Sequence, residues 1–171
     1  MSLINTVSPE NAENETKETY DMMLNLCGEV PKPLELFSVS PGLLKLRRNL
    51  LEYYISLNLG SSLLTFIRQL TSTNCGAGAC SRFNARLLKA GGVTDSDLKA
   101  IQKDSDKAPL EDKEKKLLSF VLSAVNDPES TEQTDIDELR ELGWKDQEIF
   151  EAVHQGADMV LVGYMMKIFK M

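Results

Sequence analysis

The spacing of hydrophobic residues is helical along almost the whole chain. Aliphatic and aromatic residues recur at intervals of three and four, and no window alternates apolar and polar residues as a half-buried strand does. The last such series, from Asp146 to Met171, has these members on one side: Ile149, Val153, Ala157, Val160, Leu161, Tyr164 and Ile168. The pattern predicts an all-α fold, a helical bundle of about seven or eight helices.

Capping residues and helix breakers divide this pattern into elements. Ser8-Pro9 predicts a first helix start, because Ser is a good N-cap and Pro is favoured at the first helical position. Thr94 with Asp97 resembles a capping box, and Pro109 and then Thr134 open later helices. The predicted helices cover residues 8–28, a short turn at 34–37, 43–57, 63–73, 78–89, 94–104, 109–126, 136–142 and 146–171.

Composition narrows the class of protein. The chain has 171 residues, is 42% hydrophobic and 26% charged, and contains no low-complexity linker, so we expect a single globular domain over residues 1–171. The net charge of −7 disfavours a nucleic-acid partner. No apolar stretch is long enough for a membrane span, and the N-terminus has no signal-peptide pattern. With three cysteines and no disulfide framework, we expect a cytoplasmic protein.

Two segments echo each other. Gly92–Leu98 and Gly143–Ile149 share the order glycine, apolar, polar, Asp, polar, acidic, aliphatic. This order combines a glycine helix stop, an apolar residue under the turn and an acidic first turn on the next helix dipole. The echo fits a duplicated helical hairpin, and it fits equally two hairpins with the same local solution.

Candidate chemistry concentrates between Leu70 and Asn84, where two cysteines and two glycines meet at the N-terminus of a predicted helix. A helix N-terminus and the nearby Arg82 both favour a thiolate, so Cys80 is the candidate nucleophile, although buried free cysteines are often inert. Asn84 lies one turn after Cys80 on the same helix face. Cys75 can pair with Cys80 only if Gly76 and Gly78 keep the intervening chain irregular.

The order of these segments resembles the AhpD-like, or carboxymuconolactone decarboxylase, family, in its peroxidase-related subgroup. The resemblance extends over nearly the whole chain. The segments that carry it are residues 30–37, 40–44, 63–72, 85–92, 92–98, 118–125 and 142–152. It implies an all-helical fold and a homo-oligomer, usually a trimer or hexamer. The apolar C-terminal helix and residues 66–70 are then the expected interface.

The family's active site has a Glu, two cysteines and a His. In that family the second cysteine attacks the peroxide, the first cysteine then forms a disulfide with it, and the Glu and His move the protons. Aligning Cys80 with the second cysteine places Ala77 at the first cysteine, Asn84 at the histidine and Thr65 at the glutamate. The resemblance therefore implies a thiol-dependent hydroperoxidase with a degenerate active site, in which Cys75 can act as a shifted resolving thiol. The alternative is an inactive or ligand-binding oligomer. A third possibility, decarboxylation of a lactone acid, is disfavoured because the reaction needs a proton donor and this segment contains none.

The remaining candidates are isolated residues. His154 can approach Cys80 from the last helix or satisfy a local hydrogen bond, and Glu52 can supply a carboxylate or lie solvated. One histidine and three scattered cysteines do not complete a tetrahedral metal site, so we expect no metal and no cofactor. The expected partners are a second copy of the chain and a small-molecule peroxide or unknown ligand.

Overall fold

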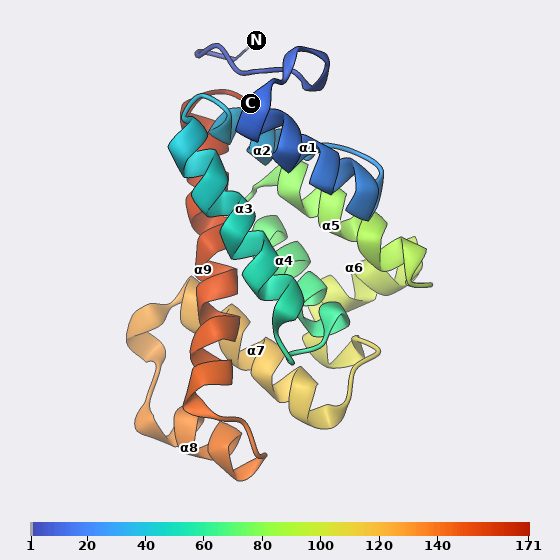
Figure 1. Cartoon of the computed structure of the whole chain (residues 1–171). Helices are drawn as coiled ribbons and strands as arrows, with labels where there is room; N and C mark the ends of the chain where they lie inside the picture. The colour runs from blue at the N-terminus through green and yellow to red at the C-terminus, as the bar shows by residue number, and fades with distance from the viewer. Residues whose placement is uncertain (1) are drawn as a thin grey trace. The chain divides into compact units, whose positions relative to one another are not determined.

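The computed structural model describes residues 2–171, which form α-helices and short 3₁₀ turns, with no β-strand among them. Figure 1 follows the helices from the N-terminus to the C-terminus. The all-α prediction is confirmed, and nine α-helices form within the described residues rather than seven or eight. In the same residues, no helix has the length and apolar character needed to cross a bilayer.

The chain groups into two compact units. One unit contains the residues up to Asn58 together with Val162–Met171, and the other contains Leu59–Leu161. The single domain over residues 1–171 therefore stays a prediction. Because the candidate site lies entirely in the second unit, the first is described only briefly.

The first unit is built on the packing of α1 and α2 against α3. Its elements are η1 (Pro9–Asn11), α1 (Asn14–Cys27), α2 (Lys32–Phe37), α3 (Pro41–Ser56) and the end of α9 (Asp146–Ile168). Tyr20 is buried in this unit and donates its hydroxyl to the carbonyl of Val7 at 2.8 Å. Ion pairs from Lys45 to Glu15 and from Arg48 to Glu18 join α3 to α1.

The second unit is built around α4 and α7, and its core includes Leu63, Phe66 and Ile67 of α4 and Leu117, Leu118 and Val121 of α7. Its elements are α4 (Ser61–Asn74), α5 (Gly78–Ala90), α6 (Asp95–Lys103), η2 (Ser105–Lys107), α7 (Asp112–Asn126), η3 (Pro128–Ser130), α8 (Gln133–Glu141) and the first part of α9. Gly156 of α9 permits a close approach, because a Cβ there would lie 2.9 Å from Val121. The expectation that residues 66–70 form an interface is wrong, since Phe66, Ile67 and Leu70 are buried in the core.

The predicted start of the first helix is wrong. Ser8-Pro9 opens only the three-residue turn η1, because Ala12 returns to an extended conformation with φ −73° and ψ 134°. The α-helix begins at Asn14 instead. Its predicted end is confirmed, since Gly28 has φ +75° and donates its N–H to the carbonyl of Leu24 at 2.9 Å.

Two later helices start at other residues than predicted. Glu111 is the N-cap of α7 and Glu132 is the N-cap of α8, in place of starts set by Pro109 and Thr134. The N–H of Glu111 donates to the carboxylate of Glu114 at 2.9 Å, and α7 begins one residue after it. The N–H of Glu132 donates to Asp135 at 2.8 Å in the same way, and α8 follows. These are capping-box contacts made from Glu at the N-cap position, where Ser or Thr is usual.

The two echoing segments do share their local structure. Gly92 and Gly143 have φ values of +96° and +91°, and the backbone bonds around each form a Schellman motif at a helix end. Thr94 and Asp97 then form the predicted capping box of α6. The equivalent contact before α9 runs from the N–H of Lys145 to Glu148 at 2.9 Å. The local prediction is confirmed, and both explanations of the echo remain.

Candidate functional site

The candidate site begins at the turn between α4 and α5. Gly76 has φ +70°, and its N–H donates to the carbonyl of Thr73 at 3.1 Å. The N–H of Ala77 donates to the carbonyl of Ser72 at 2.7 Å, which completes a Schellman motif at the end of α4. This tight turn lets α5 start at Gly78 and places Cys80 in its first turn, as the sequence predicts.

Hydroxyl groups fasten the two helices on either side of this turn. The hydroxyl oxygens of Thr73 and Ser81 lie 2.7 Å apart, and the amide of Gln69 donates to Thr73 at 3.2 Å. α4 and α5 are therefore held in register close to the two cysteines. Their relative position is fixed by polar contacts as well as by the buried apolar residues of α4.

Arg68 occupies the centre of the candidate site. Its Nη2 donates to the hydroxyl of Thr65 at 2.8 Å, and its Nε donates to the side-chain oxygen of Asn84 at 3.0 Å. Its Nη1 reaches the side-chain oxygen of Gln155, on α9, at 3.4 Å. The guanidinium thus lies between the two residues that the family resemblance places at the glutamate and histidine positions.

The groups around Arg68 are themselves held in place. Thr65 donates its hydroxyl to the carbonyl of Ser61 at 2.7 Å, and Asn84 donates its amide to the carbonyl of Cys80 at 2.9 Å. The exposed fractions of Asn84 and Cys80 are only 3% and 4%. Asn84 therefore links the guanidinium to the backbone beside the candidate nucleophile, through an amide that does not exchange protons near neutral pH.

Within the described residues, none of the three cysteines is part of a disulfide bond. Cys80 is buried, whereas Cys75 and Cys27 are partly exposed. The Sγ of Cys75 lies 3.6 Å from the carbonyl of Ser72 and 4.0 Å from that of Met159. Cys75 and Cys80 are therefore separate thiols in this structure, and their pairing stays a prediction.

α9 contributes residues that the sequence analysis missed. Gln155 is 1% exposed and contacts Arg68, and Glu151 and Asp158 are buried one turn to either side of it. The carboxylate of Glu151 accepts a hydrogen bond from the side-chain amide of Gln147 at 2.7 Å. The spacing Glu151, Gln155, Asp158 was the available signal, because these polar residues recur at i, i+4 and i+7 in the part of the helix where most other residues are apolar.

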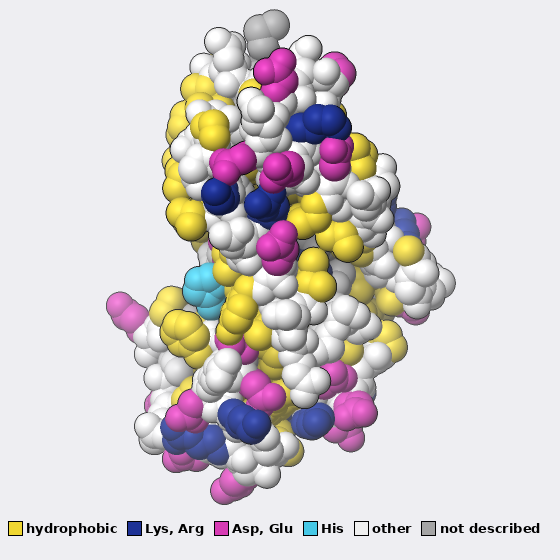
Figure 2. Space-filling model, in the orientation of Figure 1, with side chains coloured by type: hydrophobic (Ala, Val, Ile, Leu, Met, Phe, Trp, Pro, Cys, Tyr) yellow, Lys and Arg dark blue, Asp and Glu magenta, His cyan; other side chains and the backbone are white. Residues whose placement is uncertain are grey.

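The two isolated candidates lie elsewhere. His154 is exposed, with its ring 6.3 Å from that of Phe150, and Figure 2 shows the histidine at the surface beside exposed hydrophobic side chains. Glu52 is exposed on α3 in the first unit and lies 3.8 Å from Arg48. Within the described part of the chain, no three His, Cys, Asp or Glu residues are grouped so that they could hold a metal ion.

Comparison with known proteins identifies the fold. No family model and no curated protein matches the sequence. An uncharacterized peroxidase-related protein from Silicibacter sp. TM1040 has a TM-score of 0.82 at 14% identity, over 99% of this chain and 90% of that one. An uncharacterized peroxidase-related protein from Ralstonia eutropha JMP134, described as an alkylhydroperoxidase AhpD core, has a TM-score of 0.79 at 16% identity over the same shares. The chain therefore has the AhpD-like fold of these proteins.

Proposed function

We propose that this chain is an AhpD-like protein that has lost dithiol hydroperoxide reduction and acts as a ligand-binding oligomer. The observation that supports this proposal is the network of Arg68 with Thr65, Asn84 and Gln155. Groups that would have to move protons are replaced by side chains that hold fixed hydrogen bonds. Such an arrangement stabilises one geometry instead of cycling between protonation states.

The chemistry of dithiol reduction makes the loss specific. A thiolate attacks the O–O bond, the departing alkoxide takes a proton, and a second thiol then displaces water from the sulfenic acid to form a disulfide. Thr65 and Asn84 supply no proton near neutral pH, and Ala77 has no thiol. Cys75 remains as the candidate for the resolving thiol. It lies in the turn between α4 and α5, where its thiol contacts the backbone carbonyl of Ser72 and the turn is closed by backbone hydrogen bonds.

A second candidate function is a one-cysteine thiol peroxidase. In this reaction Cys80 takes the distal oxygen of a hydroperoxide to become a sulfenic acid, the alcohol leaves, and an external thiol pair reduces the sulfur. Two observations favour it: Cys80 lies in the first turn of α5, and Glu151 and Asp158 are buried carboxylates on the α9 face that carries Gln155. A carboxylate is a group that can exchange protons in such a reaction.

Hydroperoxide consumption with a dithiol reductant separates these functions. We expect negligible turnover by the wild type, Cys80→Ser and Cys75→Ser proteins, because loss of positioned acid–base groups removes roughly 10²–10⁴-fold in rate. We also expect iodoacetamide to alkylate Cys80 more slowly than Cys75, because Cys80 is buried.

Each departure from this result has a defined meaning. Turnover lost only in Cys80→Ser contradicts the proposal and supports the one-cysteine reaction, and its further loss in Glu151→Gln or Asp158→Asn identifies the acid. Turnover lost in both cysteine variants shows that Cys75 resolves the sulfenic acid. In either case the proposal that the chain has lost hydroperoxide reduction is wrong.

The proposal includes a homo-oligomer, which an exposed stripe along α9 supports. Its members alternate at spacings of four and three, as in the seam of paired helices. Within the second unit, the exposed stripe consists of Phe150, His154, Ala157 and Leu161. Phe150 is 70% exposed, which is unusual for an aromatic residue unless another surface covers it.

We expect Leu161→Asp to shift the protein toward a monomer of 19.1 kDa, because it places a charge in this stripe. Leu26→Asp is the matched control, since Leu26 is equally an exposed leucine, on α1. Sedimentation equilibrium at micromolar concentration measures both. A monomeric wild type, or dissociation by both variants alike, contradicts the assignment of the interface to α9.

A further inference from the structure

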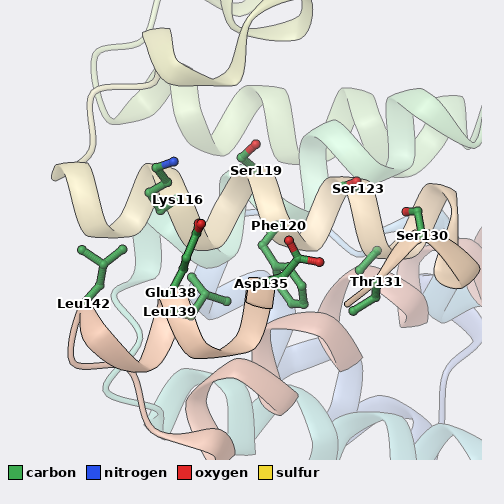
Figure 3. Close-up of a pocket in the computed structure, with 11 residues that line it drawn as sticks. Lys116, Ser119, Phe120, Ser123, Ser130, Thr131, Asp135, Glu138, Leu139 and Leu142 are labelled. Atoms are coloured by element: carbon green, nitrogen blue, oxygen red, sulfur yellow. The ribbon is translucent and has the colours of Figure 1, made fainter. Parts of the chain in front are cut away.

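We propose that a groove between α7 and α8 binds a basic amphipathic helix of a partner protein. The groove has a volume of about 420 Å³ and shares no lining residue with the Arg68 network. Its apolar surface comes from Phe120 and Ala124 of α7, from Leu139 of α8 and from Leu142, the C-cap residue of α8. Figure 3 shows Phe120 and Leu139 approaching each other across it, with Ser130 and Thr131 at one end.

The shape of the groove matches a helical ligand. Its lining residues on α7 run from Lys116 to Ala124, which is about 12 Å of helix. On α8 the lining residues Asp135, Glu138, Leu139 and Leu142 follow the spacing i, i+3, i+4 and i+7. A groove that extends over about two helical turns can accept the i, i+4 and i+7 anchors of a third helix.

The charge around the groove specifies the sign of the partner. Residues 127–151 contain ten acidic side chains and two basic ones, which is a net charge of −8 against −7 for the whole chain. The ten are Asp127, Glu129, Glu132, Asp135, Asp137, Glu138, Glu141, Asp146, Glu148 and Glu151. The negative charge of the protein is therefore concentrated on α8 and the segments that flank it. A partner with Lys or Arg beside its apolar anchors complements this surface.

The basic residues nearby only partly offset the acidic ones, because one lysine, Lys116, lines the α7 side of the groove against Asp135 and Glu138 on its α8 side. Arg140 forms ion pairs with Asp137 and Asp146 at 2.8 Å, outside the groove lining, and its hydrogen bonds hold the pKa of the Asp146 carboxyl below its usual value. Asp135 and Glu138 lie on the groove itself, and Figure 3 shows both on its α8 side. Asp135 accepts one backbone bond from Glu132 and, as a carboxylate, keeps further acceptor sites.

Calorimetry with a model peptide tests the proposal on the full chain. The probe is a 15-residue peptide of lysine and alanine with leucine at positions 4, 8 and 11. Two comparison peptides have glutamate in place of lysine, or the same composition with leucines that no longer share a face. We expect the first peptide alone to bind, with an affinity that falls as salt is raised from 50 to 300 mM, because screening weakens attraction between exposed charges.

Two groove variants and two matched controls locate the binding. Asp135→Asn/Glu138→Gln removes two charges from the groove, and Asp127→Asn/Glu129→Gln removes two from the same acidic segment outside it. Leu142→Gln alters the apolar surface at a residue that is 42% exposed, so folding is retained, and Ile55→Gln is its control on α3. We expect each groove variant to weaken binding by about ten-fold or more, and each control by less than about two-fold.

The outcomes decide the proposal. Equal weakening by the groove and control charge variants, or equal binding of the scrambled peptide, means general attraction to an acidic surface and overturns it. Absence of binding by the first peptide also overturns it. If the groove variants instead dissociate an oligomer of the protein, the occupant is a second copy of the chain and the proposed partner is wrong.

Discussion

Replacing Arg68 with methionine is expected to lower the free energy of unfolding by about 2–5 kcal/mol, which is a large effect for one substitution. Methionine keeps most of the apolar stem of Arg68 but removes the donors to Thr65, Asn84 and Gln155. The oxygens of Asn84 and Gln155 are then left in the interior without this partner, and each such loss costs about 1–3 kcal/mol. Urea denaturation measures the change.

Arg86→Met is the matched control for this experiment. Arg86 is exposed on α5, with its guanidinium carbon 5.9 Å from the centre of the Phe83 ring, so its loss is expected to cost less than about 0.5 kcal/mol. Arg68→Lys should give an intermediate value, because one ammonium cannot span three oxygens in the geometry of a guanidinium. Equal, small effects of Arg68→Met and Arg86→Met would show that the network does not stabilise the fold.

The helices were predictable from the sequence where a local signal decides them. Glycine ends a helix at Gly28 and Gly92 because each adopts a positive φ that most residues avoid, and Thr94 caps α6 with its own side chain. The starts of α7 and α8 were not predictable in the same way. Glu111 and Glu132 are weak N-cap residues by type, and their capping depends on an acidic residue three positions later.

The candidate site was predictable in one half only. The order of segments placed Thr65 on α4 at the family's glutamate position and Asn84 on α5 at its histidine position. In the structure both side chains contact the guanidinium of Arg68. No sequence pattern pointed to Arg68 itself, which lies within the segment 63–72. Its contact with Gln155 joins residues 87 positions apart, and no local pattern specifies which helix face meets another over that separation. The remaining signal in the sequence for a role of Arg68 was its positive charge within the mostly apolar segment 63–70.

Introducing the Glu, Cys and His that the family resemblance places in the active site is expected to give no hydroperoxide turnover while Arg68 is present. Consider Thr65→Glu, Ala77→Cys and Asn84→His combined, which returns a glutamate, a first cysteine and a histidine to the aligned positions. Arg68 Nη2 lies 2.8 Å from the side chain at position 65. A guanidinium at this distance lowers the pKa of a carboxyl by roughly 1–3 units, so the new glutamate stays ionised and exchanges protons poorly near neutral pH.

Adding Arg68→Gln to these three substitutions is expected to raise hydroperoxide turnover with a dithiol reductant by about 10²–10³-fold over the triple variant. The neutral amide still donates a hydrogen bond but no longer holds the carboxylate in its charged form. Arg82→Gln in place of Arg68→Gln is the matched control, because Arg82 is also close to the first turn of α5, with Nη1 3.2 Å from a Cβ built on Gly78. Its addition should leave the triple variant nearly inactive.

Two results contradict this account of Arg68. If the triple variant already turns over hydroperoxide rapidly, the guanidinium does not suppress the relay. The second result concerns the variant that carries Arg68→Gln, whose folding circular dichroism and urea denaturation can establish. If this variant is folded and yet inactive, positions 65, 77 and 84 do not form a relay with Cys80. Activity confined to the variant that carries Arg68→Gln, with none in the triple variant or in its Arg82→Gln form, means instead that the charge of Arg68 keeps this site from proton transfer.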